Sequence, residues 1–215
     1  ERIVATFGHE PRWSPDGSLI LFRRTVVLPD LPIFYVVGLD GAPPRPVRPD
    51  VLGRFSSLQA AWHPDGRRIS IWGTTRDGEV RFLTVPIEAG VAAATQKSAR
   101  VQQELARVSA GRFVWAPSRR FIYFEGQAGD TQDVWRVTVD PLTENWVDGP
   151  ERLTSDGRHA TNVAISRDGR RLLFTTTSSR TRVWAFPFDS AVGRITGQPH
   201  PITDGSTGEA DFDAR

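Results

Sequence analysis

The sequence predicts an all-β fold, a β-propeller with four recognisable four-stranded blades. Three observations carry this prediction: a tight-turn motif recurs four times, the copies stand about fifty residues apart, and a short apolar run follows each copy. The copies are Trp13-Ser14-Pro15-Asp16-Gly17, Trp62-His63-Pro64-Asp65-Gly66, Trp115-Ala116-Pro117-Ser118 and Ile165-Ser166-Arg167-Asp168-Gly169. A period near fifty that is built of short strands is typical of one propeller blade per repeat.

The residues of the motif suit a tight turn between two strands. Pro15 pre-sets the backbone for the second turn position, and Gly17 accepts the left-handed conformation that lets the next strand fold back. The third copy has Ser118-Arg119 where Asp-Gly is expected, and the fourth has Arg167 in place of proline. We expect these two turns to be looser or of another type.

A tryptophan stands just before the turn in three copies, and Ile165 takes its place in the fourth. Aromatic residues at a repeated structural position usually pack in the core. We therefore expect Trp13, Trp62 and Trp115 to lie between adjacent blades rather than to stack on a ligand.

Alternating apolar residues and turn residues divide the chain into blades. The predicted divisions are 1–11 (last strand of a preceding blade), 12–60 (blade 1), 61–113 (blade 2), 114–163 (blade 3) and 164–215 (blade 4). Blade 2 contains a helical insertion near 94–108, because its apolar residues recur at alternating steps of four and three.

The two ends of the chain bear on ring closure. Ile3-Val4 read as the last strand of a blade that precedes the first turn motif, whereas Pro201-Ile202-Thr203 already supply the last strand of the fourth blade. We therefore expect part of a larger ring of six to eight blades. Missing blades, or self-association of an incomplete ring, would cover the apolar faces of the terminal blades.

Composition excludes several classes of protein. The 215 residues carry 27 basic and 25 acidic side chains, and arginine pairs such as Arg67-Arg68 are dispersed, which favours a solvated rim over a nucleic-acid surface. Without cysteine, no disulfide framework or thiol nucleophile is possible, and the redox compartment stays open. The longest apolar stretch, 26–37, is interrupted by Pro29, Asp30 and Pro32, so no membrane segment is predicted.

Recognised catalytic motifs do not occur in the sequence. It has no Gly-x-Ser-x-Gly elbow, no His-Glu-x-x-His and no phosphate-binding glycine loop, so the chain alone is predicted not to be an enzyme and to need neither metal nor cofactor. His63 and His200 are expected at the surface. His9 and His159 both precede the first strand of a blade, which would place them at one mouth of the central channel.

Four polar residues stand three positions before the tryptophan or its equivalent: Glu10, Gln59, Arg112 and Asn162. In a repeat protein, a position that stays polar while its identity changes is where a specific ligand surface would be built. We predict that these residues form a ligand-binding channel mouth, with His9 and His159 at its periphery. The alternative is that they are simply solvated channel residues.

The order of these motifs resembles a known family. The succession of Trp-Ser-Pro-Asp-Gly, an apolar strand, Val134-Trp135-Arg136-Val137 and Glu151-Arg152-Leu153-Thr154 is similar to the TolB-like, WD-repeat-like β-propellers of bacteria, over the whole chain. Stretches 133–141 and 182–189 more particularly resemble propeller modules that lie C-terminal to bacterial serine/threonine kinases and one-component transcription regulators.

The resemblance implies a non-catalytic sensor or protein-interaction module of a larger bacterial signalling protein, which binds a protein, a peptide or a small molecule at its channel mouth. Two alternatives stay open: the substrate-gating propeller of a prolyl-oligopeptidase-type serine peptidase, and a periplasmic scaffold similar to TolB. The resemblance favours a periplasmic or other extracytoplasmic location and leaves a cytoplasmic one open. A Gly-x-Ser-x-Gly domain downstream in the same protein would favour the peptidase.

Overall fold

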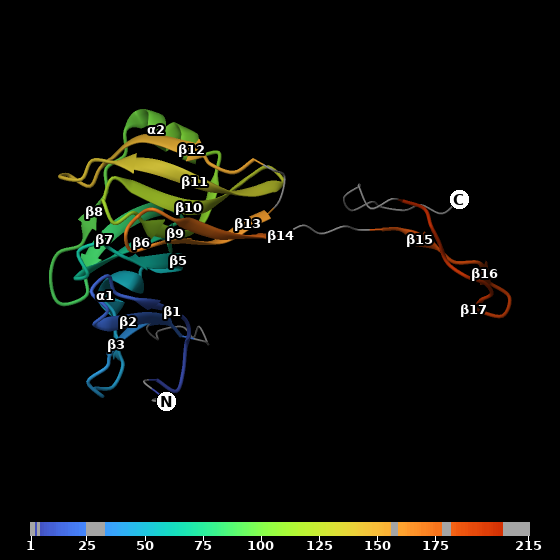
Figure 1. Ribbon diagram of the computed structural model, residues 1–215, viewed down its shortest axis with the longest axis horizontal. Coiled ribbons are helices and arrows are strands. Elements are labelled where there is room, and N and C mark those ends of the chain that lie inside the picture. Colours follow the sequence, from blue (N-terminus) through green and yellow to red (C-terminus); the bar gives the residue numbers. More distant parts are fainter. Residues whose placement is uncertain (1–2, 4, 25–32, 156–158, 178–181, 204–215) are drawn as a thin grey trace. The chain divides into compact units, whose positions relative to one another are not determined.

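The computed structural model describes residues 3, 5–24, 33–155, 159–177 and 182–203 (Figure 1). The chain divides into two compact units, Glu1–Thr176 and Thr177–Arg215. Each unit is described by itself below.

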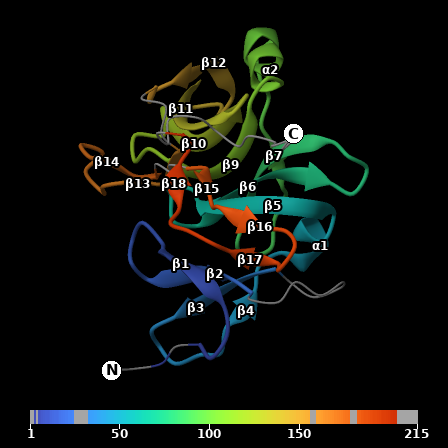
Figure 2. The ribbon, with the colours of Figure 1, turned by 90° about the vertical axis from the view of Figure 1, so that its right-hand side faces the viewer.

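Three four-stranded antiparallel sheets make up most of the larger unit, and in each sheet the strand order follows the chain. The first contains β1 (His9–Trp13), β2 (Leu19–Arg23), β3 (Phe34–Gly38) and β4 (Arg45–Pro46). The second contains β5 (Phe55–Trp62), β6 (Arg68–Thr75), β7 (Val80–Pro86) and β8 (Ala93–Ala94). The third contains β9 (Ser109–Trp115), β10 (Phe121–Ala128), β11 (Thr131–Val139) and β12 (Trp146–Arg152). The predicted four-stranded meander of a propeller blade is thus confirmed three times (Figures 1 and 2).

The strands of the fourth repeat are divided between the two units. β13 (His159–Ile165) and β14 (Leu172–Thr177) pair with each other. In the smaller unit, β15 (Trp184–Ala185) pairs with β18 (His200–Pro201), and β16 (Phe188–Asp189) pairs with β17 (Arg194–Ile195).

One backbone hydrogen bond shows that the smaller unit repeats the pairing of the third sheet. The Leu153 N–H donates to the Val134 carbonyl at 2.8 Å, and the Ile202 N–H donates to the Val183 carbonyl at 2.8 Å. Phe34 and Phe82 accept the equivalent bonds in the first two sheets, from Val47 and Thr95. The third and fourth strands of the last repeat therefore pair as in the other repeats.

The hydrophobic core lies between successive sheets. Leu21 and Val36 of the first sheet share one cluster with Ile69, Ile71 and Val85 of the second. A second cluster, between the second and third sheets, is mostly aromatic: its rings include Trp72, Phe82, Phe113, Phe124 and Trp146, with centroids 4.8–6.0 Å apart. Packing of sheet on sheet, rather than within a sheet, holds the unit together.

The tryptophans before the turns do pack between sheets, but only where a sheet precedes them. Trp62 and Trp115 are 7% and 5% exposed. The indole Nε1–H of Trp62 donates to the Arg12 carbonyl (2.9 Å), and that of Trp115 donates to Ser70 Oγ (2.9 Å). Trp13 is 57% exposed, so its predicted burial is wrong for the described structure. The reason is that each tryptophan packs on the preceding sheet, and no sheet precedes β1 among the described residues.

The turns of the third and fourth repeats keep the geometry of the first two, contrary to the expectation of looser turns. Arg119 has φ 59°, close to Gly17 (76°), Gly66 (71°) and Gly169 (71°). Its N–H donates to the Ala116 carbonyl at 2.9 Å, as the glycine N–H of each other copy donates to the carbonyl three residues before it. Arginine here occupies a left-handed conformation that glycine adopts at less cost.

Two short helices interrupt the sheets. α2 (Ala99–Leu105) lies within the predicted insertion near 94–108 but is shorter, because the hydroxyl of Ser98 caps it by accepting from the Val101 N–H (3.3 Å). Ala94 belongs instead to β8. α1 (Pro49–Leu52) was not predicted. Within the described ranges, the helices are too short to cross a membrane.

The strand expected at Ile3-Val4 cannot be placed in full. Val4 lies outside the described residues, and Ile3 belongs to no described strand and is 77% exposed.

We expect Trp62→Ala and Trp115→Ala each to lower the free energy of unfolding by about 3–5 kcal/mol, because each substitution leaves a cavity between two sheets and removes an indole hydrogen bond. Trp13→Ala is the matched control and should change it by less than about 1 kcal/mol, since its ring is mostly exposed. Urea denaturation of the three variants measures the difference. Equal losses in all three would contradict this packing.

We expect Arg119→Gly to raise the free energy of unfolding by about 0.5 kcal/mol, because relief of the left-handed backbone exceeds the extra entropy that glycine loses on folding. Arg120→Gly should lower the stability instead, since Arg120 has no positive φ to relieve. Thermal denaturation compares the two exposed, neighbouring positions. A stabilising effect of Arg120→Gly, or a loss at Arg119→Gly, would show that the turn is built differently.

Candidate functional site: the channel at the ends of the inner strands

A cavity of about 1040 Å³ lies where the first strands of the four repeats end. Its wall is formed by the last residues of β1, β5, β9 and β13 and by the turns that follow them. The charged, amide and indole side chains that line it are those of Arg12, Trp13, Asp16, Asp65, Arg112, Asn162 and Arg167. We call this cavity the channel. It lies at the ends of the inner strands, where the repeat pattern predicted a channel mouth.

The structure brings three of the predicted site residues together. Arg112 and Asn162 line the channel. Glu10 lies beside them, since its Oε2 is 2.9 Å from Arg112 Nη2. Polar residues from the first and third sheets thus meet across the end of β5.

Gln59, His9 and His159 lie elsewhere. Gln59 lines a separate cavity. His9 Nε2 is 3.7 Å from Glu10 Oε1, whereas His159 is exposed at the start of β13, and neither histidine is among the residues that line the channel. Both histidines lie within strands rather than before them.

β-Bulges explain why Gln59 separates from its counterparts. Glu125 of β10 faces two residues of β9, Gly111 and Arg112, because the register shifts there. The register of β1 shifts between His9 and Arg12, so Glu10 lies in a similar irregularity. The pairing of β5 is regular at Gln59. Since one inserted residue reverses the face to which a side chain points, equal sequence positions do not give equal orientations.

Glu10 and Asn162 have unusual backbone conformations, with φ of 55° and 57°. Asparagine tolerates the left-handed region, but glutamate adopts it at a cost of about 1–3 kcal/mol. Such a conformation persists only where the surroundings hold it, and it occurs often at binding sites. Two strained residues at the same repeat position mark this part of the channel as a site candidate.

Arg12 is a channel residue that the repeat pattern did not predict. Its Nη1 donates to the Ala60 carbonyl (2.5 Å), and its Nη2 lies 3.6 Å from Glu10 Oε2. Burial, and then the nearby Arg112 guanidinium, lower the pKa of Arg12 to about 10, against the opposing effect of Glu10 and Glu125. One signal was present: the residue before the tryptophan is apolar in the other repeats, and only the first repeat has arginine there.

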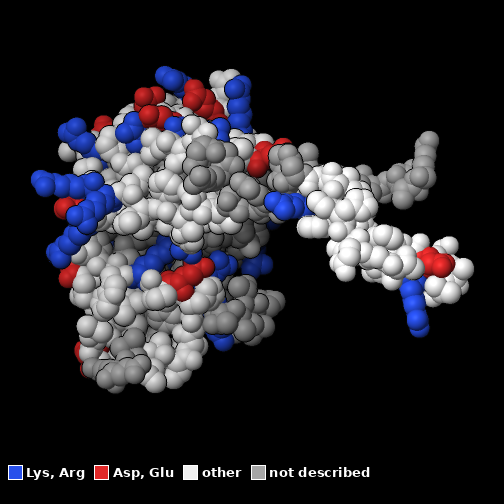
Figure 3. Space-filling model, turned by 45° about the vertical axis from the view of Figure 1, so that its right-hand side comes forward, with Lys and Arg blue, Asp and Glu red and all other residues white. Residues whose placement is uncertain are grey.

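The channel wall carries both charges in a fixed arrangement. Arg12 and Arg112 share Glu10, while the buried Glu125 accepts a hydrogen bond from the Val163 N–H (3.3 Å). Figure 3 shows basic and acidic side chains side by side across the middle of the larger unit, between two mostly uncharged areas. These contacts hold hydrogen-bond donors and acceptors in fixed positions around the channel.

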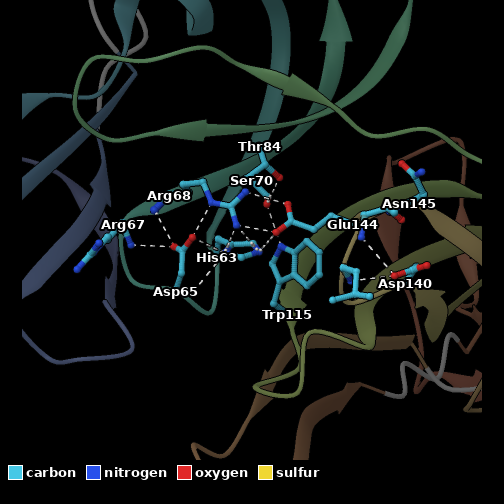
Figure 4. Close-up of polar contacts among 12 residues, drawn as sticks. His63, Asp65, Arg67, Arg68, Ser70, Thr84, Trp115, Asp140, Glu144 and Asn145 are labelled. Carbon is cyan, nitrogen blue, oxygen red and sulfur yellow. Dashed lines mark hydrogen bonds and ion pairs between the residues drawn. The ribbon is translucent and has the colours of Figure 1, made fainter.

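A second cluster of titratable groups joins the second sheet to the third (Figure 4). His63, expected at the surface, is fully buried. Its Nε2 is 3.1 Å from Glu144 Oε1 and its Nδ1 is 3.1 Å from Asp65 Oδ2, while its ring lies edge-on to Trp115 at 5.0 Å. Arg68 Nη2 also donates to Glu144 Oε1 at 2.6 Å. The cluster is filled by its own partners, so we assign it a structural role.

Burial lowers the pKa of His63, and the Arg68 guanidinium adds to this effect, against the opposing influence of Asp65 and Glu144. For Asp65, burial acts to raise the pKa, but hydrogen bonds from the Arg68 side chain and the Arg67 N–H outweigh it and hold the value at about 2. His63 is therefore neutral at pH 7 and accepts a proton less readily in the folded protein than in the unfolded chain.

The described residues contain no group of three His, Asp or Glu side chains that could hold a metal ion.

Comparison with known proteins supports the fold. No family model and no curated protein matches the sequence. Solved structures do match: TolB of Agrobacterium tumefaciens, described as putative, is 19% identical with a TM-score of 0.57, and covers 94% of this chain and 69% of its own. TolB of Acinetobacter baumannii is 14% identical with a TM-score of 0.56, and covers 91% of this chain and 43% of its own. At these identities the likeness shows the fold, and the chain is a β-propeller similar to part of TolB.

We expect the stability of the protein to fall as the pH falls from 7 to 5, in part through His63. A histidine whose folded pKa lies below its unfolded value of about 6.5 contributes full stability above that value and loses it as protons bind the unfolded chain. His63→Gln should flatten the slope of unfolding free energy against pH. His200→Gln, at an exposed position, is the control and should leave the slope unchanged. A slope that His63→Gln does not alter would contradict a neutral, buried His63.

Proposed function

We propose that this chain is a non-catalytic interaction module of a larger protein, and that its channel binds an extended peptide segment of a partner. The observation that carries the proposal is the channel itself, in which polar residues of the same repeat position differ from sheet to sheet. A repeated scaffold with a varied polar lining supplies a specific surface without a reaction centre.

The chemistry of the channel suits a peptide. An extended backbone offers donors and acceptors in alternation, and the wall presents guanidinium groups (Arg12, Arg112) beside a carboxylate (Glu10) and an amide (Asn162). Trp13 adds a large exposed ring at the rim. Arginine and tryptophan are the residue types that most often dominate binding energy at protein interfaces.

The proposal for the parent protein rests on the similarity of the repeat motifs to bacterial propeller modules. The proposed parent is a bacterial signalling protein, a kinase or a transcription regulator, in which the propeller is the sensor. A periplasmic scaffold is the second candidate, and the likeness to two TolB structures favours it. The third candidate is a propeller that gates the active site of a peptidase. A Gly-x-Ser-x-Gly domain downstream in the parent protein would favour it.

The test is selection of binding peptides from a random displayed library on the 215-residue chain, followed by affinity measurement on variants. We expect Arg112→Gln and Trp13→Ala each to weaken binding at least tenfold, because both side chains line the channel. Arg45→Gln, on the outer strand β4, is the matched control and should have no effect.

Two results would overturn the proposal. Selected peptides that bind Arg112→Gln and Trp13→Ala as tightly as the unaltered chain would place recognition outside the channel. Peptides that instead protect the outer strands β4, β8 or β12 from hydrogen exchange would show edge pairing, a different mode of recognition.

A further inference from the structure

A second cavity, of about 700 Å³, lies at the opposite ends of β5 and β9 from the channel. It is bounded by the first residues of these strands, by the end of β6 and by α2. Its volume is in the range of small-molecule sites. Gln59, which the repeat pattern singled out as a ligand-binding residue, belongs to this cavity.

The ionisable groups of this cavity are all basic. Lys97 and Arg23 line it, and no carboxylate stands among the described lining residues. Neither side chain forms an ion pair with another described residue, although Arg12, Arg48, Arg68 and several other arginines of the chain do. Two cations that line one cavity, without a carboxylate among its described lining residues, favour an anion.

Lys97 is held at this wall by its backbone. It is the only lysine in the sequence. Its neighbours bond Trp146 on both sides: the Trp146 N–H donates to the Gln96 carbonyl (2.9 Å), and the Ser98 N–H donates to the Trp146 carbonyl (3.0 Å). The ammonium lies 5.2 Å from the centroid of the Trp146 ring, so an aromatic face, not a carboxylate, accompanies its charge. Burial lowers the pKa of Lys97 in this setting, and a bound anion would offset that effect.

The remainder of the wall is apolar with a few amides. Leu58, Trp72 and Leu105 supply aliphatic and aromatic surface. The side-chain amides of Gln59 and Gln102 also line the cavity, and neither bonds another described side chain. A small inorganic anion would leave this apolar surface without a contact. A ligand that joins an anionic group to an apolar body would bury it, which stabilises the complex.

We propose that this cavity binds a small carboxylic acid with an apolar body, whose carboxylate pairs with Lys97 and Arg23 and whose body packs on Trp72 and Leu105. The site is separate from the peptide channel and does not depend on it. Lys97 and Arg23 carry the recognition of charge, and the amides of Gln59 and Gln102 orient polar groups of the ligand.

The single lysine gives a clean probe. Reductive ¹³C-methylation labels Lys97 and the terminal amine, whose signals separate by pH titration. The labelled chain is titrated with 4-phenylbutyrate and octanoate, with the matching primary amides as uncharged controls and with inorganic phosphate as a bare anion. We expect a saturable shift of the Lys97 signal with the two acids and at least tenfold weaker binding of the amides and of phosphate.

Variants identify the residues by calorimetry with the same acids. Lys97→Gln and Arg23→Gln should each weaken binding at least tenfold, and Lys97→Arg should retain part of it. Arg100→Gln, at an exposed position of α2 outside the cavity, is the matched control.

Four results would overturn the proposal: no saturable shift with either acid, equal binding of the amides, phosphate binding as tightly as the acids, or unchanged binding in Lys97→Gln. The labelled unaltered chain gives the first three results even where a variant fails to fold. Channel variants such as Arg112→Gln should leave acid binding unchanged, which separates this site from peptide binding.

Discussion

The structure depends on the contact of each inner-strand tryptophan with the sheet before it. Trp62 and Trp115 each bury an indole ring against the preceding sheet and donate its single hydrogen bond there, to the Arg12 carbonyl and to Ser70 Oγ. A buried indole without a partner would cost about 1–3 kcal/mol, so both packing and polar satisfaction fix the spacing of the sheets. That spacing sets where the inner strands end, and the channel lies at those ends.

The same geometry gives the two cavities different chemistry. Arg112 of β9 lines the channel, where it joins Glu10 in a mixed network of charges. The preceding residue, Gly111, lines the second cavity, whose charged side chains, Lys97 and Arg23, are basic. Both residues lie in one β-bulge, opposite Glu125. Recognition of a peptide and of a small acid can therefore coexist on one scaffold.

Local chemistry explains what the sequence predicted well. Turn residues and apolar alternation predicted the four-stranded meander that three sheets show, because both signals act within a few residues. The looser turn expected at Arg119 was wrong, since the hydrogen bond across the turn holds a left-handed arginine. The burial of His63 was missed because its partner Glu144 lies far along the chain. Of the predicted site residues, Glu10, Arg112 and Asn162 lie together and Gln59 does not. The reason is that β-bulges change the orientation of Glu10 and Arg112, whereas the pairing at Gln59 is regular.

Hydrogen exchange at the indole Nε1–H groups tests the central claim most directly, since each tryptophan gives a separate signal. We expect slow exchange for Trp62 and Trp115, near the rate set by global unfolding, and fast exchange for Trp13, whose ring meets no preceding sheet among the described residues. Equally slow exchange of Trp13, or fast exchange of Trp62 and Trp115, would contradict the claim that these indoles set the contact between sheets.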